Sequence, residues 1–177
     1  MATFYIVSQW LAQYGESVAG MPYSEALKLL SIYTNGSLAG VFCSSLALRT
    51  FLSPQMMLLG CTTVSTLALA VACFFPSPTV MFGFSFIFGF AAAGGVVQLG
   101  LAMMAAQFPR ARGRATGIYY SAGSISNFTM PLITAWIVRE WSIHEIFKFD
   151  VIISGCGILL AVFIAWRSRH AQAIDLN

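Results

Sequence analysis

The feature of the sequence that most constrains its fold is the length of its uncharged apolar runs. No charged residue occurs from Thr79 to Gln107, and none occurs between Arg114 and Arg139. A helix rises 1.5 Å per residue, so about 20 apolar residues cross a hydrocarbon core about 30 Å thick. Both runs reach that length, and they predict helices that span a membrane.

The composition of the chain supports the same interpretation. The 177 residues are 58% hydrophobic and 8% charged, whereas soluble domains carry about 25% charged residues. The nine basic residues lie at the ends of apolar runs and do not form one stripe, which argues against a nucleic-acid-binding protein. The expected partner is the lipid bilayer.

Counting the apolar runs predicts an all-α, polytopic transmembrane helix bundle with about five full spans and one partial span. The first run is interrupted by Gln13, Glu16 and two glycines, which leaves roughly 12 residues or about 18 Å of helix. We expect one transmembrane domain over residues 1–177, with a cytoplasmic tail at 167–177. The predicted spans are 2–14 (partial), 24–48, 55–75, 79–108, 113–138 and 145–166.

The arginines predict the orientation of these spans, because lysine and arginine accumulate on the cytoplasmic side of a membrane. With the C-terminus in the cytoplasm, six of the nine basic residues fall on that side. They are Arg49, Arg110, Arg112, Arg114, Arg167 and Arg169. The chain is therefore expected to be a multi-pass protein of the cell membrane, of the bacterial inner-membrane type.

The sequence carries no motif typical of catalysis, of metal binding or of cofactor binding. The sequence has no HExxH motif, and no carboxylate pair or histidine falls inside a predicted span. His144 and His170 lie outside the apolar runs, so neither is expected to pair with Ser124 as a catalytic dyad. The four cysteines form no CxxC pair. We expect no enzyme, no metal site and no cofactor.

Small and polar residues recur at helical spacing in three of the runs. In the second run the spacing of four between Gly36, Gly40 and Ser44 predicts a close approach by another helix. The fourth run is expected to place Ala91, Gly94, Gly95, Gln98 and Ala102 on one face. The fifth, the most polar, is expected to place Thr116, Tyr120, Ser124, Asn127 and Thr134 on one face, with Pro131 on the same side.

Uncharged polar groups at membrane depth indicate either packing contacts or a solute path. Such groups are expected to face inward from the first, second, fourth and fifth runs, while the third and sixth carry almost none. This partition favours four helices around a cavity and two outside it, although any one of these groups alone also fits an interhelical hydrogen bond. The candidate cavity-lining residues are Gln9, Gln13, Asn35, Gln98, Tyr120 and Asn127.

Charged side chains are not expected in the middle of any span. Lys148 and Asp150 come at the beginning of the sixth run, and we place both near the outer interface. Any carboxylate that couples transport to a proton or an ion would then lie elsewhere than in this chain, or be absent.

The stretch FPRARGRATGIYYSAGSISNFTMPLI, residues 108–133, resembles the cytoplasmic connector and following helix of the major facilitator superfamily. It has an arginine–glycine pair, a glycine one turn later and a proline in mid-helix. A second loop, after the second run, keeps Leu46 and Arg49 but has Leu48 where the family favours aspartate. The resemblance covers essentially the whole chain and implies the C-terminal half, with the seventh helix cut short.

The resemblance implies a fold and a function. Family members have two six-helix halves built from inverted repeats, and the first, second, fourth and fifth helices of each half line the solute cavity. The chain would be a fragment of a secondary transporter, a permease that moves a small solute by alternating access. It would not be competent without an N-terminal six-helix half. Two alternatives are a non-transporting membrane interaction or scaffold protein and a homodimeric half-transporter.

Overall fold

A computed structural model describes residues 2–50 and 53–174, with side chains over 2–47 and 53–166. Within those ranges every regular element is helical, which confirms the all-α class. The elements are α1 (Ala2–Ser17), α2 (Tyr23–Thr50), α3 (Pro54–Phe74), α4 (Pro78–Phe88), the π-helix η1 (Gly89–Val96), α5 (Val97–Gln107), α6 (Arg112–Glu140) and α7 (Ile143–Ile174).

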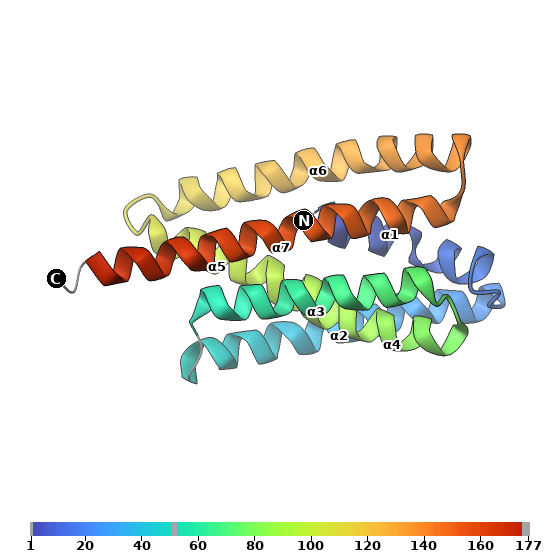
Figure 1. Ribbon diagram of the computed structural model, residues 1–177, viewed down its shortest axis with the longest axis horizontal. Coiled ribbons are helices and arrows are strands. Elements are labelled where there is room, and N and C mark those ends of the chain that lie inside the picture. The colour runs from blue at the N-terminus through green and yellow to red at the C-terminus, as the bar shows by residue number, and fades with distance from the viewer. Residues whose placement is uncertain (1, 51–52, 175–177) are drawn as a thin grey trace.

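The helices run along the long axis of the molecule, with their connections gathered at its two ends (Figure 1). The α2–α3 and α5–α6 connections and the C-terminal end of α7 lie at one end. The α1–α2, α3–α4 and α6–α7 connections lie at the other end, and α1 begins about midway along the bundle. The three segments that carry the predicted cytoplasmic arginines therefore share one end.

Three helices in the described part of the chain are long and apolar enough to cross a membrane, namely Pro54–Phe74, Pro78–Gln107 and the Ile143–Trp166 part of α7. The second of these comprises α4, η1 and α5 in continuous succession. Helices α2 and α6 are also long, at 28 and 29 residues, but more polar. The chain is thus a multi-pass helix bundle.

Helix α1 is longer than the sequence indicated. It continues through Gln13 and Gly15 to Ser17, 16 residues in all, or about 24 Å. The predicted break at Gly15 is wrong because that glycine serves packing: a Cβ there would lie 2.7 Å from Leu29 Cδ1 of α2. The chain turns instead at Gly20, whose φ of 68° is a conformation that glycine adopts without strain.

The closest helix packing joins α2 to the α4–η1 segment. A Cβ on Gly40 would lie 2.3 Å from the carbonyl oxygen of Phe90, and one on Gly94 would lie 2.5 Å from the carbonyl oxygen of Ser37. Ser44 Oγ donates a hydrogen bond of 2.8 Å to the Gly94 carbonyl. Backbones can approach this closely only where side chains are absent or small. The predicted small face of α2 is confirmed, and we call this contact the glycine seam.

The π-helical turn changes which residues share a face. Gly94 and Gly95 are buried at the glycine seam or against α3, whereas Gln98 and Ala102 are exposed. The expectation that these four residues lie on one face together with Ala91 is wrong, because a π-turn holds more residues than an α-turn and shifts every later side chain around the axis.

Tyr14 ties the end of α1 to two other helices. Its fully buried ring stacks on Phe147 of α7 at 3.7 Å between centroids. Its hydroxyl is 3.0 Å from His144 Nδ1 and donates to the Ala72 carbonyl of α3 at 3.4 Å. Around this contact lies the main core, made by α1, α2, α3, the α4–η1 segment and α7.

The polar residues of α3 do not face lipid. Thr62, Ser65 and Thr66 are buried, and the Thr66 hydroxyl is hydrogen-bonded to the Ser154 hydroxyl of α7. The expectation that the third and sixth runs carry almost no inward polar groups is therefore wrong. Helices α3 and α7 pack against each other, and their hydroxyls satisfy one another there.

Candidate solute-cavity face

Helix α1 presents a polar stripe on the side opposite its core contacts. Gln9 and Gln13, four residues apart, are exposed, while Val7, Leu11 and Tyr14 are buried. Residues at this spacing lie above one another on one helix face. The core contacts thus hold α1 in a rotation that leaves both amides free of the bundle interior.

Asn35 of α2 and Gln98 of α5 are exposed in the same way. Asn35 is followed by Gly36, whose Cα faces the backbone of Phe86 in the glycine seam, so the amide is turned away from the tightest contact. Gln98 precedes the fully buried Leu99. Tyr119 of α6 donates a 2.8 Å hydrogen bond to the Val97 carbonyl and thereby fixes α5 beside α6.

Helix α6 has three distinct faces. Its packed face includes the buried residues Ala115, Gly123, Thr134 and Ile137. At 100° per residue, Tyr120, Ser124 and Asn127 form a second, exposed polar face next to it. A third, exposed face is apolar and comprises Ile118, Ile125, Phe128, Leu132 and Trp136.

One expected member of the polar face of α6 lies elsewhere. Thr134 is fully buried and accepts a 3.0 Å hydrogen bond from Trp10 Nε1 of α1, while its own hydroxyl donates to the Met130 carbonyl. Pro131 lies within α6 between Asn127 and Thr134, and a proline there bends the helix axis and changes the register of the faces.

The structure brings together the helices that carry the six candidate residues. Helix α1 contacts α2 and α6, and α6 contacts α5. Gln9, Gln13, Asn35, Gln98, Tyr120 and Asn127 are all exposed, and none makes a side-chain hydrogen bond to another described residue. They lie on the open surface of these helices, and we call them the polar wall.

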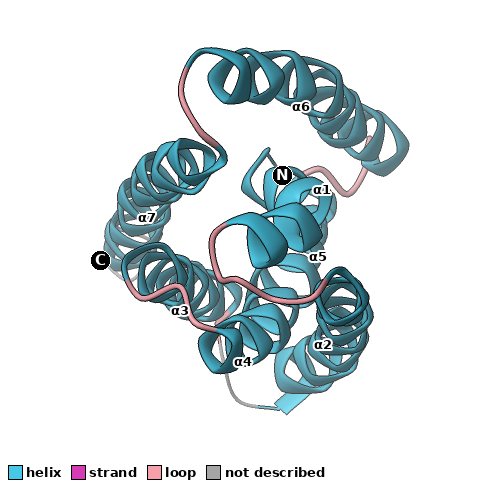
Figure 2. Cartoon of the chain, turned by 90° about the vertical axis from the view of Figure 1, so that its right-hand side faces the viewer, coloured by secondary structure: helices cyan, strands magenta, loops and turns pink. Residues whose placement is uncertain are grey.

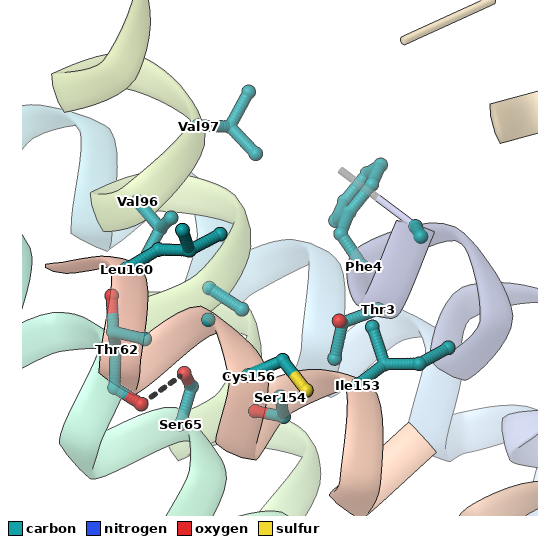
Figure 3. A pocket seen from close by; sticks show the side chains of 13 residues that line it. Thr3, Phe4, Thr62, Ser65, Val96, Val97, Ile153, Ser154, Cys156 and Leu160 are labelled. Atoms are coloured by element: carbon teal, nitrogen blue, oxygen red, sulfur yellow. Dashed lines mark hydrogen bonds between the residues drawn. The ribbon is translucent and has the colours of Figure 1, made fainter. Parts of the chain in front are cut away.

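A partly open pocket of about 310 Å³ lies elsewhere among the described residues. It is bounded by the first turn of α1, by α3, by η1 and the start of α5, and by α7 (Figure 3). Hydroxyl groups reach it from Thr3, Thr62, Ser65 and Ser154. None of the polar-wall residues lines it. The sequence signal for it was the cluster of hydroxyl residues on the third run, a run that was expected to lie outside the solute cavity.

Three arginines mark the end of the bundle that holds the α5–α6 connection. Arg110, Arg112 and Arg114 are exposed at the α5–α6 connection and the first turn of α6. The side chain of Arg49, at the end of α2, lies outside the described residues, as do those of Arg167 and Arg169. Among the described side chains no cluster of three or more histidine, cysteine or acidic groups is placed to hold a metal.

The position of Asp150 corrects an expectation from the sequence. It was placed near the outer interface, but its side chain is 0% exposed and lies inside the bundle. Lys148, two residues earlier, is exposed and pairs with Glu145 at 2.6 Å. A buried carboxylate is therefore present within the membrane-spanning part of this chain.

The end-on arrangement of the helices completes the geometry (Figure 2). Helix α6 stands at the edge of the bundle, next to α1 and α7, while α2, α3 and the α4–η1 segment cluster on the other side.

The family model described as Major Facilitator Superfamily matches residues 1–176. The chain belongs to this family.

Individual relatives agree with the family match. The chain is 54% identical over 169 residues to the inner membrane transport protein YdiM of Escherichia coli K12, and 37% identical over 176 residues to the inner membrane transport protein YdiN of the same organism. It is 32% identical over 168 residues to YfkL of Bacillus subtilis 168, an uncharacterised transporter of this family type. These matches cover 96%, 99% and 95% of the chain.

The matches cover much less of the relatives. In each case the chain spans 42% of the length of the relative. The resemblance found in the connector and helix at residues 108–133 is confirmed at the level of the family.

Proposed function

We propose that this chain forms one half of a secondary transporter that moves a small solute across the cytoplasmic membrane by alternating access. The observation that supports it best is the division of α6 into separate faces. Tyr120, Ser124 and Asn127 make an exposed polar face, and exposed apolar side chains make another. Such a polar face is unfavourable on a helix exposed only to lipid, because hydrocarbon cannot form a hydrogen bond with the amide side chain of Asn127.

The polar wall forms one side of the solute cavity in this proposal. Its six residues come from α1, α2, α5 and α6, the helices that correspond to the first, second, fourth and fifth of a six-helix half. Uncharged amides and a phenol suit a neutral or weakly polar solute. The second side is supplied by an N-terminal six-helix half, and alternating access requires that the two halves rock around the site between them.

The orientation follows from the arginines. The connections after α2 and α5 and the C-terminal end of α7 share one end of the bundle (Figure 1). This is the end with Arg110, Arg112 and Arg114, and by the positive-inside rule it faces the cytoplasm. The C-terminus is then cytoplasmic.

The test is reconstitution. The chain would be joined to the six-helix part of a YdiM-type relative that it does not match, placed in proteoliposomes and screened for uptake of small neutral and weakly polar solutes. We expect uptake by the joined protein and none by the chain alone. Equal uptake by the chain alone, with a crosslinked dimer, would instead establish a homodimeric half-transporter. No uptake by either, with both correctly inserted, would favour the scaffold alternative.

A further inference from the structure

Asp150 is the only described acidic residue whose side chain is buried in the helix bundle. It lies seven residues after the start of α7, about 10 Å along the helix axis. Its side chain is 0% exposed, and no described residue except Thr3 of α1 is placed to donate a hydrogen bond to its carboxylate oxygens. Buried polar groups are otherwise nearly always paired, so this group requires an explanation.

The surroundings of the carboxyl come from three helices. Phe147, one turn earlier on α7, is fully buried against Tyr14. The side chain of Thr3 on α1 interacts with the carboxyl group, and Tyr33 of α2 lies close enough to interact with it electrostatically. The Tyr33 hydroxyl donates to the Phe4 carbonyl at 3.5 Å, so its proton is directed away from Asp150.

The described residues offer this carboxyl no cationic partner. Tyr33 is the one titratable side chain that faces it from α2, and Thr3, from α1, does not titrate. The α-amino group of the chain attracts the carboxylate electrostatically, but its placement lies outside the described residues. An unpaired buried charge costs several kcal/mol after relaxation, which is a large part of the stability of a typical domain.

A bound proton removes that cost most simply. Metal cations with oxygen ligands need about six to eight of them, whereas the described neighbours supply the carboxyl and the Thr3 hydroxyl. Asp150, Ser154 and Gly157 follow each other at i, i+4 and i+7 on one face of α7. Ser154 and Gly157 line the pocket described above, as Thr3 does (Figure 3). Asp150 itself does not line it, but it lies one turn from Ser154 on α7.

We propose that Asp150 is a proton-binding site at the junction of α1, α2 and α7. One carboxylate oxygen takes a proton from water to form the neutral carboxylic acid, and it returns the proton to water when the junction opens. Loss of the proton would leave a charge between the three helices and loosen their contact. Because α1 and α2 carry part of the polar wall, proton binding would be coupled to solute movement; this last clause rests on the function proposed above.

The test uses infrared spectroscopy, since a protonated carboxyl absorbs apart from a carboxylate. The chain has two aspartates, Asp150 and Asp175. Cell-free synthesis with carboxyl-¹³C aspartate would therefore label two groups, and Asp175→Asn would leave one. At neutral pH we expect a ¹³C-shifted band of a protonated carboxyl that persists in Asp175→Asn and is absent from Asp150→Asn, and we expect the band to disappear as the pH is raised further.

Each other outcome contradicts the proposal. A labelled Asp175→Asn chain that shows only a carboxylate band at every pH would overturn it, as would a band that survives in Asp150→Asn. Loss of the band on replacing potassium by sodium at constant pH would identify a sodium site instead. If Asp150→Asn does not fold, the Asp175→Asn chain still decides, because it holds a single aspartate.

One further control separates the causes. A glycine–serine extension ahead of Met1 moves the amino charge away, and the band should be unchanged. The measurement needs no solute, so failure of the proton site and failure of the transporter function are distinguishable.

Discussion

The glycine seam and helix α6 represent two ways in which helices are held in this chain. At the seam, α2 and the α4–η1 segment meet through backbone atoms, with a Cβ on Gly36 or Gly40 only 2.3 Å from a carbonyl oxygen. Of the 29 residues of α6, the buried ones are Ala115, Gly123, Thr134 and Ile137. Both sides of the seam belong to this chain, whereas the polar and the apolar face of α6 are left exposed by the bundle.

This difference separates residues that build the fold from residues free to contact a solute or a second half. Packing between membrane helices depends on close van der Waals contact and not on a hydrophobic driving force. The seam therefore tolerates no added atoms, while the polar face of α6 can change without loss of the fold. The predictions below test that separation.

The largest effect is expected at the seam. Gly40→Ala should destabilise the folded chain by about 2–3 kcal/mol, because the new methyl group overlaps the Phe90 carbonyl and forces the helices apart. The measurement is denaturant unfolding in detergent micelles, followed by circular dichroism.

Gly60→Ala is the matched control for the seam. Nothing lies within 4 Å of a Cβ built on Gly60 of α3, so alanine should be neutral or stabilise the helix by up to about 1 kcal/mol. Helix propensity alone favours alanine at both positions. The same sign of effect at Gly40 and Gly60 would contradict the close approach described for the seam.

The second effect concerns solute uptake and the polar face of α6. Asn127→Leu in the joined transporter should lower uptake about tenfold, which corresponds to the loss of about 1.4 kcal/mol of interaction, without changing stability. Ser121→Leu is the control, because Ser121 is exposed on the same helix but lies among the apolar side chains. Equal losses in the two variants would argue against the polar wall.

A smaller effect is expected where α6 does touch the bundle. Thr134→Val removes the acceptor of the Trp10 Nε1 hydrogen bond and should cost about 1 kcal/mol of stability. The comparison is Thr134→Ser, which keeps the oxygen. A double-mutant cycle with Trp10→Phe measures the pair directly, and additive effects would show that the hydrogen bond contributes nothing.

The smallest effect is that of one hydroxyl within the seam. Ser44→Ala removes the 2.8 Å hydrogen bond to the Gly94 carbonyl, together with the contact of the same hydroxyl with the Gly40 carbonyl of its own helix. The loss should be about 0.6 kcal/mol, the average for hydrogen bonds between membrane helices. Ser45, exposed and bonded only to the Phe42 carbonyl of its own helix, is the control. If Ser45→Ala destabilises the chain as much as Ser44→Ala does, the stabilisation comes from hydrogen bonding within α2 and not from the bond to Gly94.

Sequence periodicity predicted the seam correctly because a spacing of four is the repeat by which an α-helix meets another helix. It failed for Gln98 because a π-turn intervenes, and the run of small residues from Gly89 to Val96 gives no sign of its hydrogen-bond register. It failed for Thr134 because that residue lies about three helical turns after Gly123 and therefore on the packed face of α6.

The buried polar groups of α3 and α7 could not have been assigned from one helix at a time. Thr66 and Ser154 satisfy each other across 88 positions of sequence, and neither run alone shows where its partner lies. Asp150 lies close to the beginning of an apolar run, where a charge ordinarily reaches the interface. Its burial depends on how α1, α2 and α7 meet, which is a property of the tertiary structure.

The account depends most on the claim that the polar face of α6 meets water and solute while its apolar face meets lipid. The direct measurement is labelling with a water-soluble maleimide of single cysteines placed at Asn127 and Ser121, in the joined transporter with its four native cysteines replaced. We predict rapid labelling at position 127, slowed by the transported solute, and little labelling at position 121. Equal labelling at both positions, or faster labelling at position 121, would contradict the account.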